Sequence, residues 1–240
     1  MKLDLDVSAY VLAGGRSSRM GRDKALLRLG GRTLVQHAVA KLSRITQDVS
    51  LLAGAAPGNP DLSACGRRVF DVHPDTGPIG GIEAALADTR RDWSLIYPVD
   101  TPMVPSALLA GWVAGVLAES GNRPLRIAMF VDDGVPQSAL LMIHRELLSY
   151  VRETIGEGKL KLFPALQWAA GQIAHRLGVE SEELMRQDSL DACVEKLRGS
   201  EAWNTDFSEE QRADVKSWFV NLNTPEDFAW AEEHPGLLDT

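Results

Sequence analysis

The chain has 240 residues, a formal net charge of −8 and 24% charged residues. This length allows one large domain, or one domain plus a subdomain, and the ordinary composition excludes an intrinsically disordered chain. The acidic balance argues against nucleic-acid and membrane-surface binding, because both need a broad positive field.

The cysteine content and the apolar pattern indicate a cytoplasmic protein. Cys65 and Cys193 lie far apart and lack metal-ligand spacing, so we expect two reduced thiols. Asp4 and Asp6 interrupt the N-terminal stretch, which therefore lacks the layout of a secretory signal. No apolar run approaches the roughly 18 residues that are needed to span a bilayer.

Up to about residue 145, short apolar runs alternate with amphipathic stretches. The predicted strands span 7–13, 48–54, 67–72 and 93–99, and the predicted helices span 33–45, 80–90 and 105–120. This alternation is typical of βαβ units around a mainly parallel sheet. Because ligands bind such sheets at the carboxyl ends of the strands, the residues just after each predicted strand are candidates for a site.

Beyond residue 124 the pattern becomes less regular. Residues 125–131 and 137–143 are predicted strands, and the second is expected to be antiparallel after the turn DDGV. Residues 144–216 have mostly helical patterns, 217–222 predict a last strand, and 224–234 predict a capped helix. No linker marks a second domain, so we expect a single domain, 1–240, with a helical insertion over 156–216.

The segment after the first predicted strand reads LAGGRSSRMGRDKA over residues 12–25. Gly14 and Gly15 allow a sharp turn whose backbone N–H groups approach an anion closely. Residues 16–32 contain six basic side chains and one acidic one, so this segment carries +5. Any one of these side chains alone is more often a solvated surface residue. Together with the glycine turn they suit a polyphosphate. Neither the Walker A spacing nor the dinucleotide fingerprint is present.

Residues 12–27, LAGGRSSRMGRDKALL, closely resemble the loop of the molybdenum cofactor guanylyltransferases and their cytidylyltransferase relatives. Three further stretches resemble the family in the same order: HPDTGPIGG at 73–81, YPVDTPMVP at 97–105 and NLNTPED at 221–227. The last of these favours guanylyl over cytidylyl transfer. The resemblance implies a Rossmann-like three-layer αβα sandwich with a mostly parallel mixed sheet, as in glycosyltransferase-A-like nucleotidyltransferases.

The resemblance also implies roles for individual residues. The nucleotide contacts would come from Leu12, Ala13, Gly14, Gly15, Lys24, Asp71 and Asp100, and the pterin contacts from Gly81, Asn221 and Asn223. Lys24 and Arg19 would contact the phosphates, and Asp100 would hold Mg2+. From the residues alone, Asp100 is equally suited to cap the helix near Pro105. Asp71 is equally suited to a turn.

Two further interpretations come from the residues themselves. Asn221 and Asn223 alternate about Leu222, so in a strand they would share a face. Asn223 is also suited to cap the helix that follows. His73 and His144 lack partners at metal spacing and are interpreted as structural.

The implied reaction joins a phosphate of molybdopterin, or of Mo-molybdopterin, to the α-phosphate of GTP and releases pyrophosphate. The nucleophile is an ionised phosphate oxygen, so positioning and charge neutralisation matter more than a strong base. Mg2+ favours one or two carboxylates together with phosphates and waters. Lys24, Arg19 and Asp100 would be the catalytic residues.

Two alternatives stay open. Leu52 stands where the family often has an Asn that helps to bind guanosine, which leaves CTP as an alternative nucleotide. The same chemistry with a sugar or alcohol phosphate as acceptor is the related alternative. Sugar nucleotidyltransferases usually have proline before the lysine, whereas Asp23 precedes Lys24. The second alternative is a non-catalytic nucleotide-binding adaptor that uses residues 156–216 to hold a molybdoenzyme or its chaperone.

Overall fold

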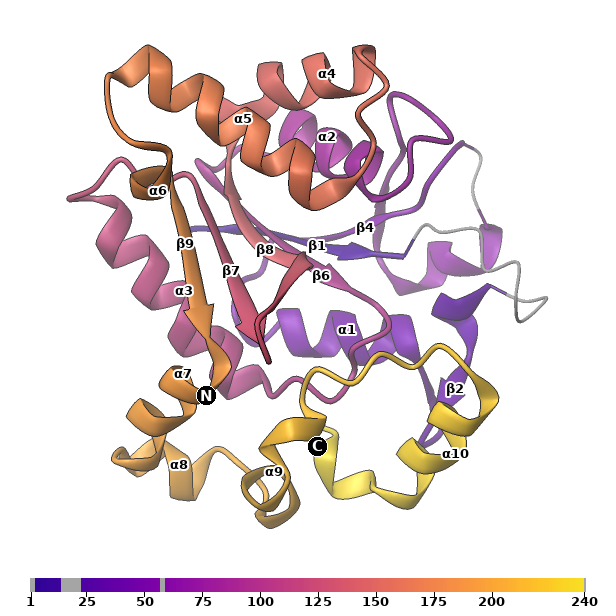
Figure 1. The fold of residues 1–240 in the computed structure, drawn as a ribbon. Coiled ribbons are helices and arrows are strands. Elements are labelled where there is room, and N and C mark those ends of the chain that lie inside the picture. The colour runs from indigo at the N-terminus through magenta and orange to yellow at the C-terminus, as the bar shows by residue number, and fades with distance from the viewer. Residues whose placement is uncertain (1–2, 14–22, 57–58, 240) are drawn as a thin grey trace.

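The structure is a computed structural model that describes residues 3–13, 23–56 and 59–239. Within this part, a mixed sheet has the strand order β5-β4-β1-β6-β8-β7-β9 (Figure 1). Its strands are β1 (Ser8–Leu12), β4 (Val49–Leu52), β5 (Arg67–Val69), β6 (Trp93–Pro98), β7 (Ile127–Asp132), β8 (Val135–His144) and β9 (Met185–Ser189). A small second sheet pairs β2 (Arg28–Leu29) with β3 (Arg32–Thr33).

The strand directions bring several strand ends to one edge. β5, β4, β1 and β6 are parallel, and β8 is antiparallel to both β6 and β7. β9 is parallel to β7. The turn between β7 and β8 has positive φ angles at Asp133 and Gly134, which suits a tight hairpin, so the predicted antiparallel strand after DDGV is confirmed.

Helices cover both faces of the sheet, which confirms the expected three-layer αβα arrangement. In Figure 1, α2 (Pro78–Asp88), α4 (Leu148–Gly156) and α5 (Leu162–Leu177) lie above the sheet, whereas α1 (Leu34–Leu42) and α3 (Ser106–Ser120) lie below it. Along β1, Ala9 and Val11 pack into one core and Tyr10 into the other. Alternation along the strand therefore places one hydrophobic core on each face.

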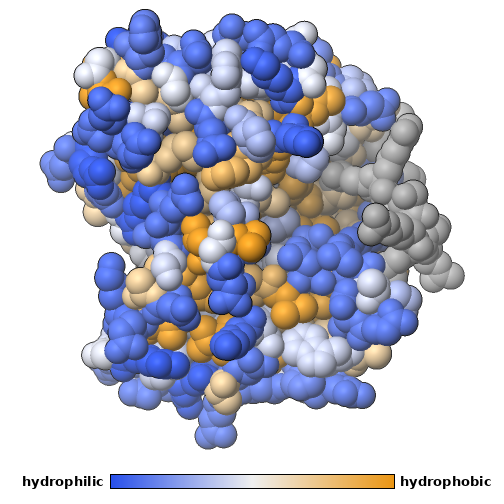
Figure 2. Space-filling view, viewed as in Figure 1, coloured by the Kyte–Doolittle hydropathy of each residue, from blue (hydrophilic) through white to orange (hydrophobic). Residues whose placement is uncertain are grey.

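The remaining elements are short or C-terminal. They are α6 (Ser181–Leu184), α7 (Leu190–Arg198), α8 (Glu201–Thr205), α9 (Glu209–Ala213), α10 (Pro225–Glu233) and the 3-10 turns η1 (Lys24–Leu26), η2 (Pro60–Cys65), η3 (Arg145–Leu147), η4 (Val215–Ser217) and η5 (Pro235–Leu237). Helices α1 and α10 begin with capping boxes at Thr33 and Thr224, which confirms both predicted starts. Viewed as in Figure 1, hydrophilic residues cover the upper and lower helices, and apolar residues gather in the hollow between them (Figure 2).

Two predicted elements in the C-terminal half are wrong. Residues 185–189 have a helical pattern but form β9. Parallel pairing with β7 and two bonds to α3, from Arg186 Nη1 to Glu119 and from Trp112 Nε1 to Asp188, hold this strand. These long-range contacts outweigh the local preference.

The second error is the strand predicted over 217–222. This segment has no strand pairing. Trp218, Phe219 and Leu222 are buried in the core, and Trp218 Nε1 donates to Gln211 O at 3.0 Å. The apolar pattern of 217–222 thus reflects packing in the core and not strand pairing.

Among the residues that the structure describes, no helix is long and apolar enough to cross a membrane. Cys65 and Cys193 are free thiols.

Candidate active site

Three side chains far apart in the sequence meet at the carboxyl edge of the sheet. Lys24 Nζ donates to Asp100 Oδ2 at 2.9 Å and to Asn223 Oδ1 at 2.6 Å. Lys24 comes from η1, Asp100 follows β6, and Asn223 precedes α10. The side chains of Lys24 and Asp100 are 15% and 26% exposed, so solvent still reaches this group. The structure therefore brings together three of the residues that the sequence singled out.

The turn that carries Asp100 is braced from several directions. Asp100 O accepts from Leu222 N at 2.9 Å, which ties the turn to the segment before Asn223. The Tyr97 hydroxyl donates to Thr101 O, and the buried Lys41 ammonium donates to Val104 O. Asp100 is thus presented by a turn with little freedom to move.

Two capping interpretations are wrong. Helix α3 begins at Ser106 without a side-chain cap bond from its N-cap residue, and Ser106 N donates instead to Asp239. Asp100 therefore does not cap α3. Thr224 is the N-cap of α10, whereas the Asn223 side chain accepts from Lys24.

Asn221 does not join this group through a hydrogen bond in the described structure. Its Nδ2 donates to Phe219 O at 3.4 Å, and the residue is exposed. The alternation that would place it beside Asn223 requires a strand, and 217–222 is not one. The predicted strand is therefore absent, although Asn221 and Asn223 are both exposed on either side of the buried Leu222. The pterin contact of Asn221 stays a prediction.

The end of β1 lies beside this group. Ala13 N donates to Leu52 O at 3.2 Å, and Leu12 O accepts from Val99 N at 3.3 Å, so both backbone groups belong to the sheet. Gly14, Gly15 and Arg19 lie outside the described residues. Their predicted contacts with the nucleotide stay predictions.

Gly81 lies on α2 where the helix packs against the sheet. A Cβ added there would lie 2.8 Å from Leu12 Cδ1 and 3.5 Å from Leu52 Cδ1. The described contacts of Gly81 are thus with two leucines. Leu52 is fully buried, so its side chain serves packing under α2.

Asp71 follows β5 at the same edge. Its amide N donates to Gly54 O at 2.9 Å, and its side chain is half-buried. Burial raises the pKa of the Asp71 carboxyl, and the charge of Glu83 raises it further.

The sequence profile of the MobA-like NTP transferase domain matches residues 9–170. The chain belongs to this family. A protein named molybdenum cofactor guanylyltransferase from Vibrio cholerae is 33% identical over 226 residues, which cover 93% of this chain and 90% of that protein. One of the same name from Vibrio atlanticus is 30% identical over 229 residues, which cover 95% and 96%.

The solved structures agree in fold. Molybdopterin-guanine dinucleotide biosynthesis protein A from Archaeoglobus fulgidus superimposes with a TM-score of 0.69 at 22% identity, covering 95% of this chain and 97% of that one. The matched MobA-like region, 9–170, contains Lys24 and Asp100 but ends before Asn223. The third member of the group is therefore supplied by the C-terminal segment that follows the matched region.

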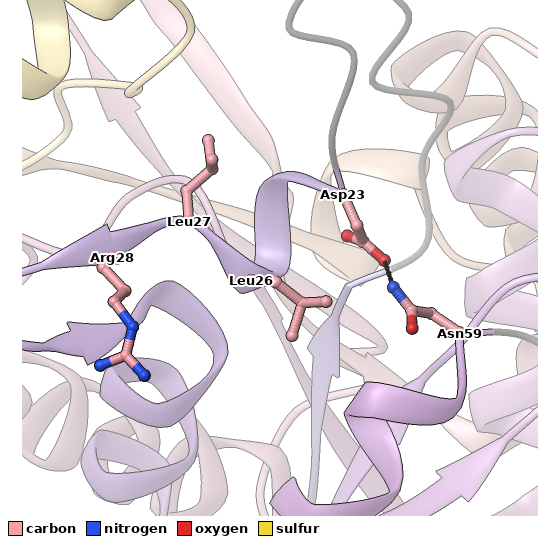
Figure 3. A pocket seen from close by; sticks show the side chains of 5 residues that line it. All are labelled: Asp23, Leu26, Leu27, Arg28 and Asn59. Atoms are coloured by element: carbon pink, nitrogen blue, oxygen red, sulfur yellow. Dashed lines mark hydrogen bonds between the residues drawn. The ribbon is translucent and has the colours of Figure 1, made fainter.

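A pocket lies beside Lys24 in the MobA-like domain. It has a volume of about 490 Å³ and is lined by Asp23, Leu26, Leu27, Arg28 and Asn59. Figure 3 shows the Asp23 and Asn59 side chains pointing toward each other, and Asn59 Nδ2 donates to Asp23 Oδ2 at 3.0 Å. Asp23 Oδ1 also accepts from Ala25 N at 3.1 Å, so Asp23 sets the turn that carries Lys24.

Sequence reasoning missed one charged cluster near Asp71. Glu83, on α2, is fully buried and binds His73 and Arg152. Its signal in the sequence is a single carboxylate within the apolar run IGGIEAAL at 79–86. A buried carboxylate needs partners, so this position was identifiable as a buried ion pair.

Proposed function

We propose that this MobA-like protein is a guanylyltransferase that transfers GMP from GTP to molybdopterin or Mo-molybdopterin and releases pyrophosphate. The observation that carries the proposal is the meeting of Lys24, Asp100 and Asn223 at the carboxyl edge of the sheet. Ligands bind α/β sheets at this edge. The named guanylyltransferases that match more than nine-tenths of the chain support GTP and the pterin as substrates.

The residues supply positioning and charge for this reaction. A phosphate oxygen of the acceptor forms a bond to the α-phosphorus of GTP, and the bond from that phosphorus to the bridging oxygen breaks. Pyrophosphate leaves with the electron pair of that bond. The attacking phosphate oxygen is already ionised, so no proton has to be removed from it. The Lys24 ammonium would neutralise charge on the phosphates, which is the main need of such a transition state.

The described residues fit a bound Mg2+. Asp100 Oδ2 and Asn223 Oδ1 converge on one cation, the Lys24 ammonium, so two oxygen ligands already face a common point. Mg2+ prefers such oxygen ligands. Among the residues that the structure describes, no group of three or more His, Cys, Asp or Glu could hold a metal. Asp100 would hold the ion with the nucleotide phosphates and waters, and the bound ion would offset phosphate charge.

The choice of base is supported by the relatives' names and not by position 52. Because Leu52 is fully buried under α2, its side chain does not reach a base. CTP remains the competing nucleotide.

Docking of a molybdoenzyme or its chaperone on 156–216 stays a prediction. The two free thiols support the predicted cytoplasmic location.

Nucleotide binding tests the proposal. We expect GTP with Mg2+ to raise the melting temperature by several degrees, since ligand at a hundred times its dissociation constant adds about 2.7 kcal/mol. ATP and UTP are the controls and should give no shift. A shift with CTP alone would favour cytidylyl transfer. No shift with any nucleotide would contradict the proposal.

A further inference from the structure

Glu83 is a fully buried carboxylate that holds two elements at once. Its Oε2 accepts from His73 Nδ1 at 2.7 Å, and its Oε1 accepts from Arg152 Nε at 2.9 Å. Its neighbours Ile82 and Ala84 are buried apolar residues. An ion in such surroundings carries a desolvation cost that good partners only roughly offset. Stability alone is therefore a weak reason for a carboxylate here.

The His73 partner lies in the loop that joins β5 to α2. The segment 71–77 of this loop folds tightly onto the first turn of the helix. Thr76 Oγ1 donates to His73 O at 2.7 Å, and a Cβ added at Gly80 would lie 3.1 Å from His73 O. Asp75 and Gly77 have positive φ angles of 63° and 71°. Glu83 thus anchors, from inside the helix, a loop whose backbone follows one narrow path.

Asp71 is the first residue of this segment and lies two residues before His73. Its amide is fixed to Gly54 O, and the charge of Glu83 acts on its carboxyl group. A carboxylate at this edge can accept hydrogen bonds from ribose hydroxyls or from base N–H groups. The position of Asp71 therefore depends on how the loop is anchored.

We propose that Glu83 is a positioning residue for the nucleotide, because through His73 it fixes the 71–77 loop and with it the Asp71 carboxylate. The Arg152 bond has a different task, which is to fasten α4 to α2. This inference rests on the proposed function, since it takes Asp71 as part of the nucleotide site. The two partners of Glu83 separate the two tasks experimentally.

The experiment measures the dissociation constant for GTP with Mg2+ by calorimetry in three variants of the full chain. His73→Ala removes the bond to the loop and should weaken GTP binding about tenfold, the scale of one charge-assisted hydrogen bond. His73→Asn keeps an N–H near the position of Nδ1 and should restore affinity to within threefold. Arg152→Met should lower the melting temperature but leave GTP affinity within twofold.

Turnover gives a second readout that a merely structural role would not move. His73→Ala should raise KM for GTP and leave kcat within twofold. The loop would contact the ribose or the base, which lie away from the reacting phosphates. Equal weakening of GTP binding by His73→Ala and Arg152→Met would overturn the inference, and so would unchanged binding in His73→Ala. Both of these outcomes apply when the parent chain itself binds GTP. A parent chain that binds no GTP would instead overturn the proposed function, and this inference with it.

Discussion

Lys24 and Asp100, 76 positions apart, form an ion pair with 2.9 Å between Nζ and Oδ2. The pair joins the residue that would neutralise phosphate charge to the residue that would hold the metal. An ammonium group and a divalent ion bound at the same carboxylate oxygen compete, because each offsets the same negative charge.

Lys24→Met should raise the affinity of the protein for a divalent ion in the absence of nucleotide. The expected gain is about fivefold, which corresponds to about 1 kcal/mol for a partly exposed ion pair. Mn2+ binding followed by electron paramagnetic resonance measures it. Lys159→Met, which removes an exposed lysine paired with Glu157, is the matched control and should leave the affinity for Mn2+ unchanged. Unchanged or weaker Mn2+ binding in Lys24→Met would refute the competition.

Asp71→Asn should stabilise the fold at neutral pH and weaken GTP binding. Burial, and then the charge of Glu83, raise the pKa of Asp71 above its ordinary value. The folded state therefore binds this proton more tightly than the unfolded state, and the ionised carboxylate costs stability at high pH. The gain in melting temperature should be full at neutral pH and should shrink as the pH falls toward the range where Asp71 itself is protonated. A gain that grows with acidity would contradict this assignment.

Asp239→Asn should destabilise the protein by about 3 kcal/mol, since it leaves a buried ammonium without its charge partner. Lys41 is 2% exposed and forms an ion pair with Asp239, and burial lowers the pKa of Lys41. Urea unfolding measures the loss. The double variant Lys41→Met with Asp239→Asn should recover most of it, because it removes the unpaired charge. A loss below about 0.5 kcal/mol in the single variant would show that this pair does not brace the turn after β6.

Gly81→Ala tests whether this glycine serves packing or the pterin. The added Cβ would overlap Leu12 Cδ1, so we expect a loss of about 1 to 3 kcal/mol and a lower melting temperature. Gly111→Ala, on α3 with no heavy atom within 4 Å of the added Cβ, is the control and should be neutral or stabilising. A Gly81→Ala protein with unchanged stability and a raised KM for the pterin would favour the substrate role.

Most of the fold can be predicted from local patterns, because a helix cap or an amphipathic stretch depends only on residues that are close in the sequence. The capping boxes at Thr33 and Thr224 need only their own next turn. β9 escaped prediction because its extended form depends on the edge of β7, more than fifty positions earlier. The segment 217–222 escaped because burial of Trp218 and Leu222 in a core has the same apolar pattern as a strand.

In the candidate site, too, the sequence identifies single residues but not the long-range contacts between them. Lys24, Asp100 and Asn223 were each identified by a resemblance to family motifs. Their contact depends on Leu222 N bonding to Asp100 O, a pairing of distant segments that no local pattern contains. Glu83 is visible in the sequence as a charge in an apolar helix, but its partners His73 and Arg152 come from a loop and from α4.

Turnover with molybdopterin is the most direct test of the central claim. The protein is incubated with Mg2+, Mo-molybdopterin and either GTP or CTP, and pyrophosphate and the dinucleotide product are quantified. We expect a guanine dinucleotide with GTP alone, and a rate at least about a hundredfold lower in Lys24→Ala, the scale of one lost transition-state contact. GTP binding without pyrophosphate release, or product with CTP alone, would contradict it.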